Sequence, residues 1–148
     1  MKNSIFLTLF LSLIGLVSFS QDIFTSENEE GRWGFVDADG KEVIPHIYEK
    51  ADCFYMGYAS VVMDGKMGLI DLKGNTIVPF EYDNDLMYFE DGLAVAKKGE
   101  KFGYVDVSGN VIIEIKYDEA EDVSNGKLKV RLGDEWLLLD KKGNEIKE

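Results

Sequence analysis

Four aspartates recur at intervals of 34 or 35 residues and could form a row of cation ligands: Asp37, Asp71, Asp106 and Asp140. Ca²⁺ is bound by several carboxylate oxygens, and the segment DADG at 37–40 resembles the start of a calcium-binding loop. In the other copies the position of Asp39 is occupied by Lys73, Ser108 and Lys142, and a lysine beside a cation is unfavourable. We therefore predict that each repeated aspartate accepts hydrogen bonds from backbone N–H groups of a turn, with calcium binding as the alternative.

The other polar residues form no recognisable catalytic group. His46 is the only histidine, so it has no partner histidine for a zinc site, and Cys53 is the only cysteine. Ser60, Ser108 and Ser124 do not lie in a nucleophile-elbow sequence. Acidic residues are too numerous for a hydrolytic carboxylate pair to be identified from sequence alone. We predict no catalytic residues, no cofactor and no metal, and a hydrolase is the least favoured alternative.

Three tyrosines are candidates for a binding surface: Tyr55, Tyr58 and Tyr88. Aromatic residues do not occupy the matching positions in every copy of the repeat described below. Tyrosine rings on a β surface can stack on sugar rings or anchor a protein partner. The alternative is that these rings pack between neighbouring units of the repeat.

These residues are positioned by an internal repeat. The sequence WGFVD at 33–37 recurs as MGLID at 67–71, FGYVD at 102–106 and, in weaker form, WLLLD at 136–140. Several other positions keep the same interval, including the glycines at 40, 74, 109 and 143 and the tyrosines at 48, 82 and 117. A fixed period of this length is typical of proteins built by stacking one small structural unit.

Each unit is predicted to contain three short antiparallel strands. In the second unit, Tyr58–Met63 has alternating apolar residues, and Asp64-Gly65 forms a two-residue hairpin turn before the strand Lys66–Asp71. A third strand at 75–78 should end at Pro79, because proline has no N–H to donate. The first unit should begin with a strand at 23–28. No helix is required anywhere from residue 21 onward.

The glycines inside the middle strands, Gly34, Gly68 and Gly103, predict a bulge or a close approach of another chain segment. Stacked units would share one continuous core with apolar residues from every unit: Val36, Ile44, Phe54, Val61, Leu69, Ile70, Ile77, Val78, Phe89, Val95, Val105, Ile112, Ile113, Leu128, Val130 and Leu138. We predict an all-β fold of four tandem three-stranded meander units, at approximately 22–56, 57–91, 92–125 and 126–148. The array is either solenoid-like or barrel-like, and a closed propeller-like ring is the alternative.

The first 20 residues have the features of a signal peptide. Lys2 precedes an apolar run at 5–19, and Ser18 and Ser20 supply small residues before a cut at Gln21. Removal of Lys2 leaves 15 basic and 28 acidic residues in a single domain at 21–148, a net charge of 15 − 28 = −13. This acidity argues against nucleic acid or anionic membranes as partners, and we expect no stable membrane insertion after cleavage. With one cysteine, expected to be partly buried, no internal disulfide can form.

The repeat resembles the WG-repeat pattern of bacterial proteins. Its aromatic–glycine pair, the following aspartate and glycine, an Ile–Pro and a tyrosine are present in the first unit, and the resemblance covers residues 23–148. Four replacements depart from the pattern: Met67 and Phe102 for tryptophan, Glu114 for proline and Leu137 for glycine. The resemblance implies a binding or structural module and brings no catalytic residues with it.

Together these observations predict a non-enzymatic, exported repeat module in the periplasm or outside the cell. Its most favoured role is as a scaffold that binds a protein or peptide. The alternative is a carbohydrate or cell-envelope binding module that uses Tyr55, Tyr58 and Tyr88.

Overall fold

The computed structural model describes residues 22–84 and 87–147, so the predicted signal peptide at 1–20 lies outside the described residues. The described residues form short strands and no helix. No helix among them is therefore long and apolar enough to cross a membrane. The strands are β1 (Phe24–Glu27), β2 (Trp33–Val36), β3 (Glu42–Tyr48), β4 (Lys50–Ala51), β5 (Tyr58–Met63), β6 (Lys66–Asp71), β7 (Thr76–Tyr82), β8 (Leu93–Lys98), β9 (Lys101–Asp106), β10 (Val111–Tyr117), β11 (Glu119–Ala120), β12 (Leu128–Leu132) and β13 (Glu135–Leu139).

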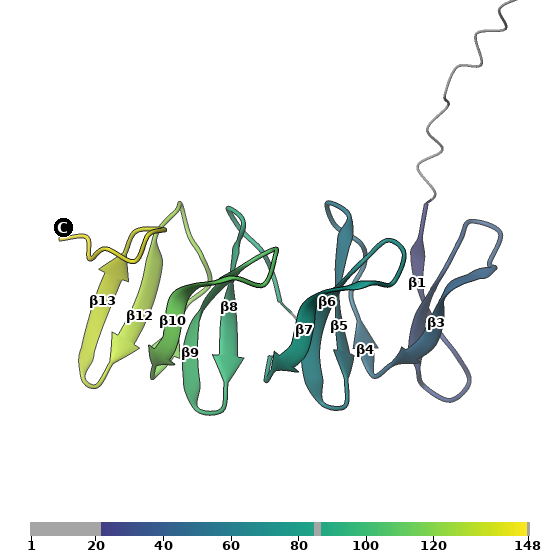
Figure 1. Ribbon diagram of the computed structural model, residues 1–148, viewed down its shortest axis with the longest axis horizontal. Coiled ribbons are helices and arrows are strands. Elements are labelled where there is room, and N and C mark those ends of the chain that lie inside the picture. The colour runs from purple at the N-terminus through teal and green to yellow at the C-terminus, as the bar shows by residue number, and fades with distance from the viewer. Residues whose placement is uncertain (1–21, 85–86, 148) are drawn as a thin grey trace, which may run out of the picture.

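The strands form four small antiparallel sheets, in the orders β1-β2-β3, β4-β5-β6-β7, β10-β9-β8 and β11-β12-β13. The sheets follow one another in a row, and β1 and β13 lie at opposite ends of that row (Figure 1). The strands of the described residues therefore do not close into a barrel or a ring. The predicted all-β class is confirmed, and the barrel-like and ring-like alternatives are wrong.

The strand boundaries in the second sheet test the sequence prediction in detail. The strands β5 and β6 have the predicted bounds, and their turn places Asp64 at φ 52° and Gly65 at φ 69°. The prediction that Pro79 ends the third strand is wrong, because β7 continues through it to Tyr82. The register between β6 and β7 shifts between Val78 and Tyr82, so Pro79 lies in a bulge of an edge strand where no N–H is needed.

The repeated glycine allows this bulge. A Cβ at Gly68 would lie 2.7 Å from the carbonyl oxygen of Val78 and 3.0 Å from the ring of Phe80. A Cβ at Gly103 would lie 2.4 Å from the Ile113 oxygen. The predicted close approach at these glycines is therefore confirmed, and it comes from the third strand of the same sheet crossing over the second.

Consecutive sheets are joined where the chain leaves a third strand and runs beside the first strand of the next hairpin. The short strands β4 and β11 pair in this way with β5 and β12. Between the second and third sheets, the side chain of Asn84 makes the corresponding contacts. Its Nδ2 donates to the Val95 oxygen at 3.0 Å, and its Oδ1 accepts from the Lys97 N–H at 2.7 Å.

Three clusters of buried side chains lie between consecutive sheets, and each contains residues of both neighbours. The first joins β2 and β3 to β5 and β6, the second joins β5, β6 and β7 to β8 and β9, and the third joins β8, β9 and β10 to β12 and β13. Of the predicted core residues, Ile112 is 38 % exposed, because its neighbour Ile113 takes the inward face of the same strand. Stacking of the sheets therefore buries apolar side chains that a single sheet would leave exposed to water.

Candidate functional site

The three candidate tyrosines lie together at one groove between the second and third sheets. The groove has a volume of about 410 Å³ and contains Tyr55, Tyr58 and Tyr88. Tyr55 is 64 % exposed and Tyr88 is 69 % exposed, whereas Tyr58 is half-buried. The rest of the lining is mostly apolar: Asp52, Cys53, Phe54, Ser60, Met87 and Phe89. Cys53, which we expected to be partly buried, is exposed.

Tyr58 is the fixed member of the aromatic group. Its ring meets the ring of Phe89 at 5.4 Å and 71°, and that of Tyr55 at 6.5 Å and 83°. Both are edge-to-face arrangements, which aromatic pairs prefer. Tyr58 and Phe89 also pack against the buried cluster between the second and third sheets, and burial raises the pKa of the Tyr58 hydroxyl. Tyr58 therefore packs between neighbouring units of the repeat, while the rings of Tyr55 and Tyr88 face solvent.

The loop that carries Tyr55 and Tyr58 is a tight turn with an unusual residue at its tip. Met56 has φ 50° and is 82 % exposed, and its neighbour Gly57 has φ 88°. In the matching turns of the next two units, Asp91 has φ 54° and Asn125 has φ 51°. Short polar residues tolerate this left-handed conformation better than methionine does. A long apolar side chain is thus held in solvent at a strained position.

The aromatic character of this junction is not required by the repeat. The positions that match Tyr55, Tyr58 and Tyr88 one unit later are Glu90, Leu93 and Asp122. The matching bridge between residues 90 and 93 forms without either tyrosine. The exposed rings are therefore a feature of one junction and not of the fold.

The repeated aspartates act within turns, as predicted. In each of the four copies, Oδ1 of the aspartate accepts hydrogen bonds of 2.8 to 3.1 Å from the N–H groups two and four residues later. In three copies an asparagine side chain also donates to Oδ2, and this bond lowers the pKa of Asp71 and Asp140. Residues 22–84 and 87–147 contain no cluster of three or more His, Cys, Asp or Glu side chains placed to hold a metal ion.

His46 has a packing role. A Cβ at Gly34 would lie 2.8 Å from the Cγ of His46, so the histidine crosses the first sheet at the same place that Phe80 crosses the second. Its Nδ1 lies 2.6 Å from the Glu42 carboxylate on the same strand. His46 lines neither the aromatic groove nor its continuation.

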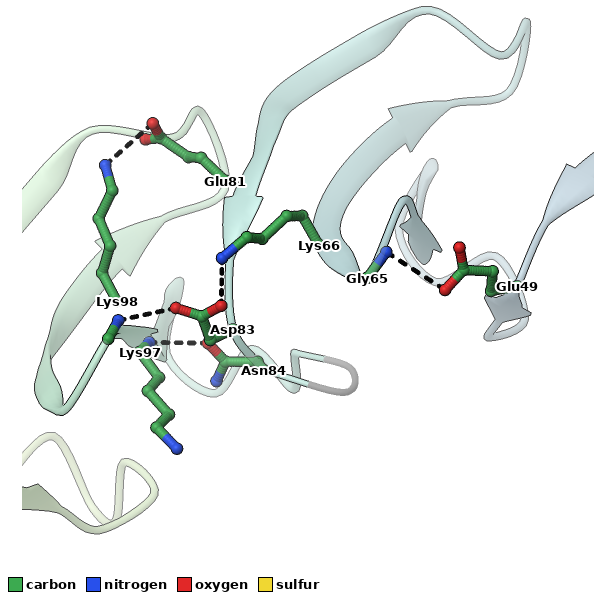
Figure 2. A network of polar contacts seen from close by, with 9 residues as sticks. Glu49, Gly65, Lys66, Glu81, Asp83, Asn84, Lys97 and Lys98 are labelled. Carbon is green, nitrogen blue, oxygen red and sulfur yellow. Dashed lines mark hydrogen bonds and ion pairs between the residues drawn. The ribbon is translucent and has the colours of Figure 1, made fainter.

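The structure also reveals a set of junction carboxylates, Glu49, Asp83 and Asp118, that we did not identify from the sequence. Each accepts a hydrogen bond from a glycine N–H in the next hairpin turn, at 3.2 Å from Gly65, 2.7 Å from Gly99 and 2.7 Å from Gly133. Figure 2 shows Asp83 in this position, bound on its other side to Lys66 of the preceding hairpin.

The cations on the other side of these carboxylates follow the same period. Arg32 lies 3.9 Å from Glu49, and Lys101 lies 2.6 Å from Asp118. The lysine partner is the main cause of the lowered pKa of Asp83 and of Asp118. Acidic and basic residues at the shared interval of 34 or 35 residues were the signal in the sequence that could have revealed these contacts.

Comparison with known protein families agrees with the geometry. A family model described as "WG containing repeat" matches residues 33–66, 67–102 and 102–136. No curated protein and no solved structure matches the chain. The three consecutive matches span most of the chain and include Gly34, Gly68 and Gly103, the glycines over which a third strand passes. The chain therefore belongs to the WG containing repeat family.

Proposed function

We propose that this chain is an exported, non-enzymatic binding module of four stacked units, which holds a protein or peptide partner in its aromatic groove in the periplasm or outside the cell. The observation that carries the proposal is the exposure of Tyr55, Met56 and Tyr88 at one junction, where the matching junction has acidic residues. Exposed aromatic and methionine side chains of this kind supply the energetic centre of many protein interfaces.

The site is suited to binding because part of it is already ordered. Tyr58 is held by Phe89 beneath the exposed ring of Tyr55, so little side-chain freedom is lost at that point when a ligand arrives. Covering the rings of Tyr55 and Tyr88 removes apolar surface from water, which favours association.

The charge of the chain favours a basic partner. The formal net charge is −12, and the groove itself includes Asp52. A field of this sign raises the rate at which a cationic partner arrives and disfavours an acidic one.

The proposal can be tested by selecting peptides from a random displayed library on the purified chain. Selected peptides should bind the wild-type chain and lose at least about tenfold in affinity on the double variant Tyr55→Ala/Tyr88→Ala, as expected when two contact residues of an interface are truncated. Leu72→Ser/Val111→Ser is the matched control, because Leu72 and Val111 are also exposed apolar residues but lie outside the groove. Equal binding to the two variants, or no selected peptide at all, would contradict a peptide site in this groove.

A carbohydrate or cell-envelope ligand is the second candidate, and the open rings of Tyr55 and Tyr88 favour it. Sugar rings stack on exposed aromatic faces without a basic group. A glycan array probed with the same two variants distinguishes the candidates: glycan binding lost only on Tyr55→Ala/Tyr88→Ala, together with no peptide selection, would replace the peptide proposal.

A hydrolase has the least support. Such an enzyme needs converging carboxyl groups, one of which has a raised pKa. The described carboxyl groups whose pKa departs from the ordinary value all have it lowered: Asp71, Asp83, Asp106, Asp118 and Asp140.

A further inference from the structure

The aromatic groove continues into a second cavity of about 440 Å³, on the side of Tyr58 that faces the third sheet. Its lining includes Tyr55, Met56, Tyr58, Phe89, Asp91 and Val107. We propose that this cavity binds the guanidinium group of an arginine side chain presented by a peptide segment of the partner. This inference rests on the proposed function and specifies the chemistry of its ligand.

The rings give the cavity the form of an aromatic box. Tyr58 stands at 83° to Tyr55 and at 71° to Phe89, so neighbouring walls are nearly perpendicular. A cation within about 6 Å of a ring centroid is attracted by the negative charge over the ring face. A planar guanidinium can stack on one wall while its N–H groups point toward another side of the box, which a compact ammonium group does less well.

The box lacks the internal cation that some other rings of this protein have. Lys129 lies 4.6 Å from the ring centre of Trp136, and Lys97 lies 5.5 Å from that of Phe102. Within 22–84 and 87–147, no lysine or arginine lies over Tyr55, Tyr58 or Phe89. A ligand can therefore supply the cation that the chain itself supplies elsewhere.

Asp91 adds a carboxylate to the same cavity. Its Oδ2 lies 3.5 Å from the Lys141 ammonium, and both side chains are more than two-fifths exposed, at 44 % and 43 %. The lysine also donates to the Asp91 backbone oxygen at 3.2 Å. An exposed pair of this kind is weak, so an arriving guanidinium can compete for the carboxylate, and Lys141 acts as a local competitor of the ligand.

The test is an NMR titration of the isotopically labelled full chain with two peptides that differ only in charge. One is a nine-residue Gly/Ser peptide with a central arginine, and the other contains citrulline, which has nearly the same shape and no charge. The arginine peptide should shift the amide signals of Gly57, Gly92 and Val107 saturably and bind at least about fivefold more tightly than its twin, since cation–π contacts and one exposed carboxylate contact are each modest.

Two variants separate a binding role from a structural one. Phe89→Leu keeps an apolar side chain in the packed position and should weaken the arginine peptide about threefold. Lys141→Ser removes the competitor and should strengthen binding about twofold, a gain that loss of structure would not produce.

Equal affinity for the arginine and citrulline peptides would overturn the inference. So would equally tight binding of tetramethylammonium chloride, because the box would then take a free organic cation and not a peptide side chain. If library-selected peptides without arginine still bind and still depend on Tyr55 and Tyr88, the cation inference fails while the proposed function stands. If no peptide is selected at all, the proposed function fails as well.

Discussion

Replacing Gly103 with alanine should destabilise the chain by about 2 kcal/mol, because the added methyl group meets backbone atoms. Its Cβ would lie 2.4 Å from the Ile113 oxygen, 2.8 Å from the Glu114 oxygen and 2.9 Å from the Glu114 carbonyl carbon. These atoms belong to β10, so side-chain rotation cannot relieve the contact. The strands β9 and β10 must instead separate by about 1 Å to reach ordinary contact.

The magnitude follows from two opposing effects. Forcing one extra carbon into a packed site costs about 1–3 kcal/mol, and contacts with rigid backbone belong at the upper end of that range. Replacing glycine by alanine also restricts the unfolded chain, which returns about 0.4–1 kcal/mol where the native φ is one that alanine can adopt. This holds at Gly103, whose φ lies outside the left-handed region. The remaining loss of about 2 kcal/mol corresponds to a fall in Tm of about 8 °C for a domain of this size.

Urea unfolding followed by tryptophan fluorescence would measure this loss, because Trp33 and Trp136 report from opposite ends of the row of sheets. Gly99→Ala is the matched control. Gly99 has φ 62° and open space around it, so alanine there costs only the left-handed conformation, about 1 kcal/mol. A Gly103→Ala variant as stable as the wild type, or more stable than Gly99→Ala, would show that β10 does not press on Gly103 as described.

Further predictions concern the contacts between sheets. Because the pKa of Asp83 and of Asp118 is lowered in the folded chain, their stabilising contribution is complete above about pH 4 and is lost as the pH falls through the folded pKa values. The double variant Asp83→Asn/Asp118→Asn should therefore lose less stability between about pH 5 and pH 2 than the wild type, as measured by Tm at each pH. Tyr104→Phe should cost about 1–3 kcal/mol in urea unfolding, because the backbone oxygen of Glu121 loses the hydroxyl that donates to it, while the Lys129 oxygen keeps the Glu121 N–H. Asn84→Ala should cost about 1–2 kcal/mol, because a backbone N–H and a backbone oxygen of β8 lose their amide partner.

Controls for these variants come from the same chain. Asp64→Asn alters an acidic residue whose side chain makes no hydrogen bond or ion pair with the described residues of a neighbouring sheet, and the Gly65 N–H beside it still reaches Glu49. This variant should leave the acid dependence of Tm unchanged. If Asp83→Asn/Asp118→Asn loses as much Tm between about pH 5 and pH 2 as the wild type, the carboxylate contacts do not stabilise the stacked sheets. If Tyr104→Phe or Asn84→Ala unfolds at the wild-type urea concentration, water replaces the lost partner at that site.

Local rules were enough to predict the hairpins. The alternation in Tyr58–Met63 and the Asp64-Gly65 turn set both ends of β5 and the start of β6, because both signals act within a few residues. The repeated aspartates were predicted correctly for the same reason, since the N–H groups they bind are two and four residues away. Pro79 was misjudged because its effect depends on which strand lies beside it, and a bulge over Gly68 removes the need for its N–H.

Residue types at a fixed interval were enough to identify the repeat, the all-β class and the family. The open row of sheets and the groove shared by Tyr55, Tyr58 and Tyr88 could be recognised only in the folded structure. Tyr88 lies 30 residues beyond Tyr58, on the far side of a complete hairpin and third strand. Their proximity arises from the way one sheet stacks on the next, and that stacking depends on buried contacts and junction carboxylates spread over the whole repeat.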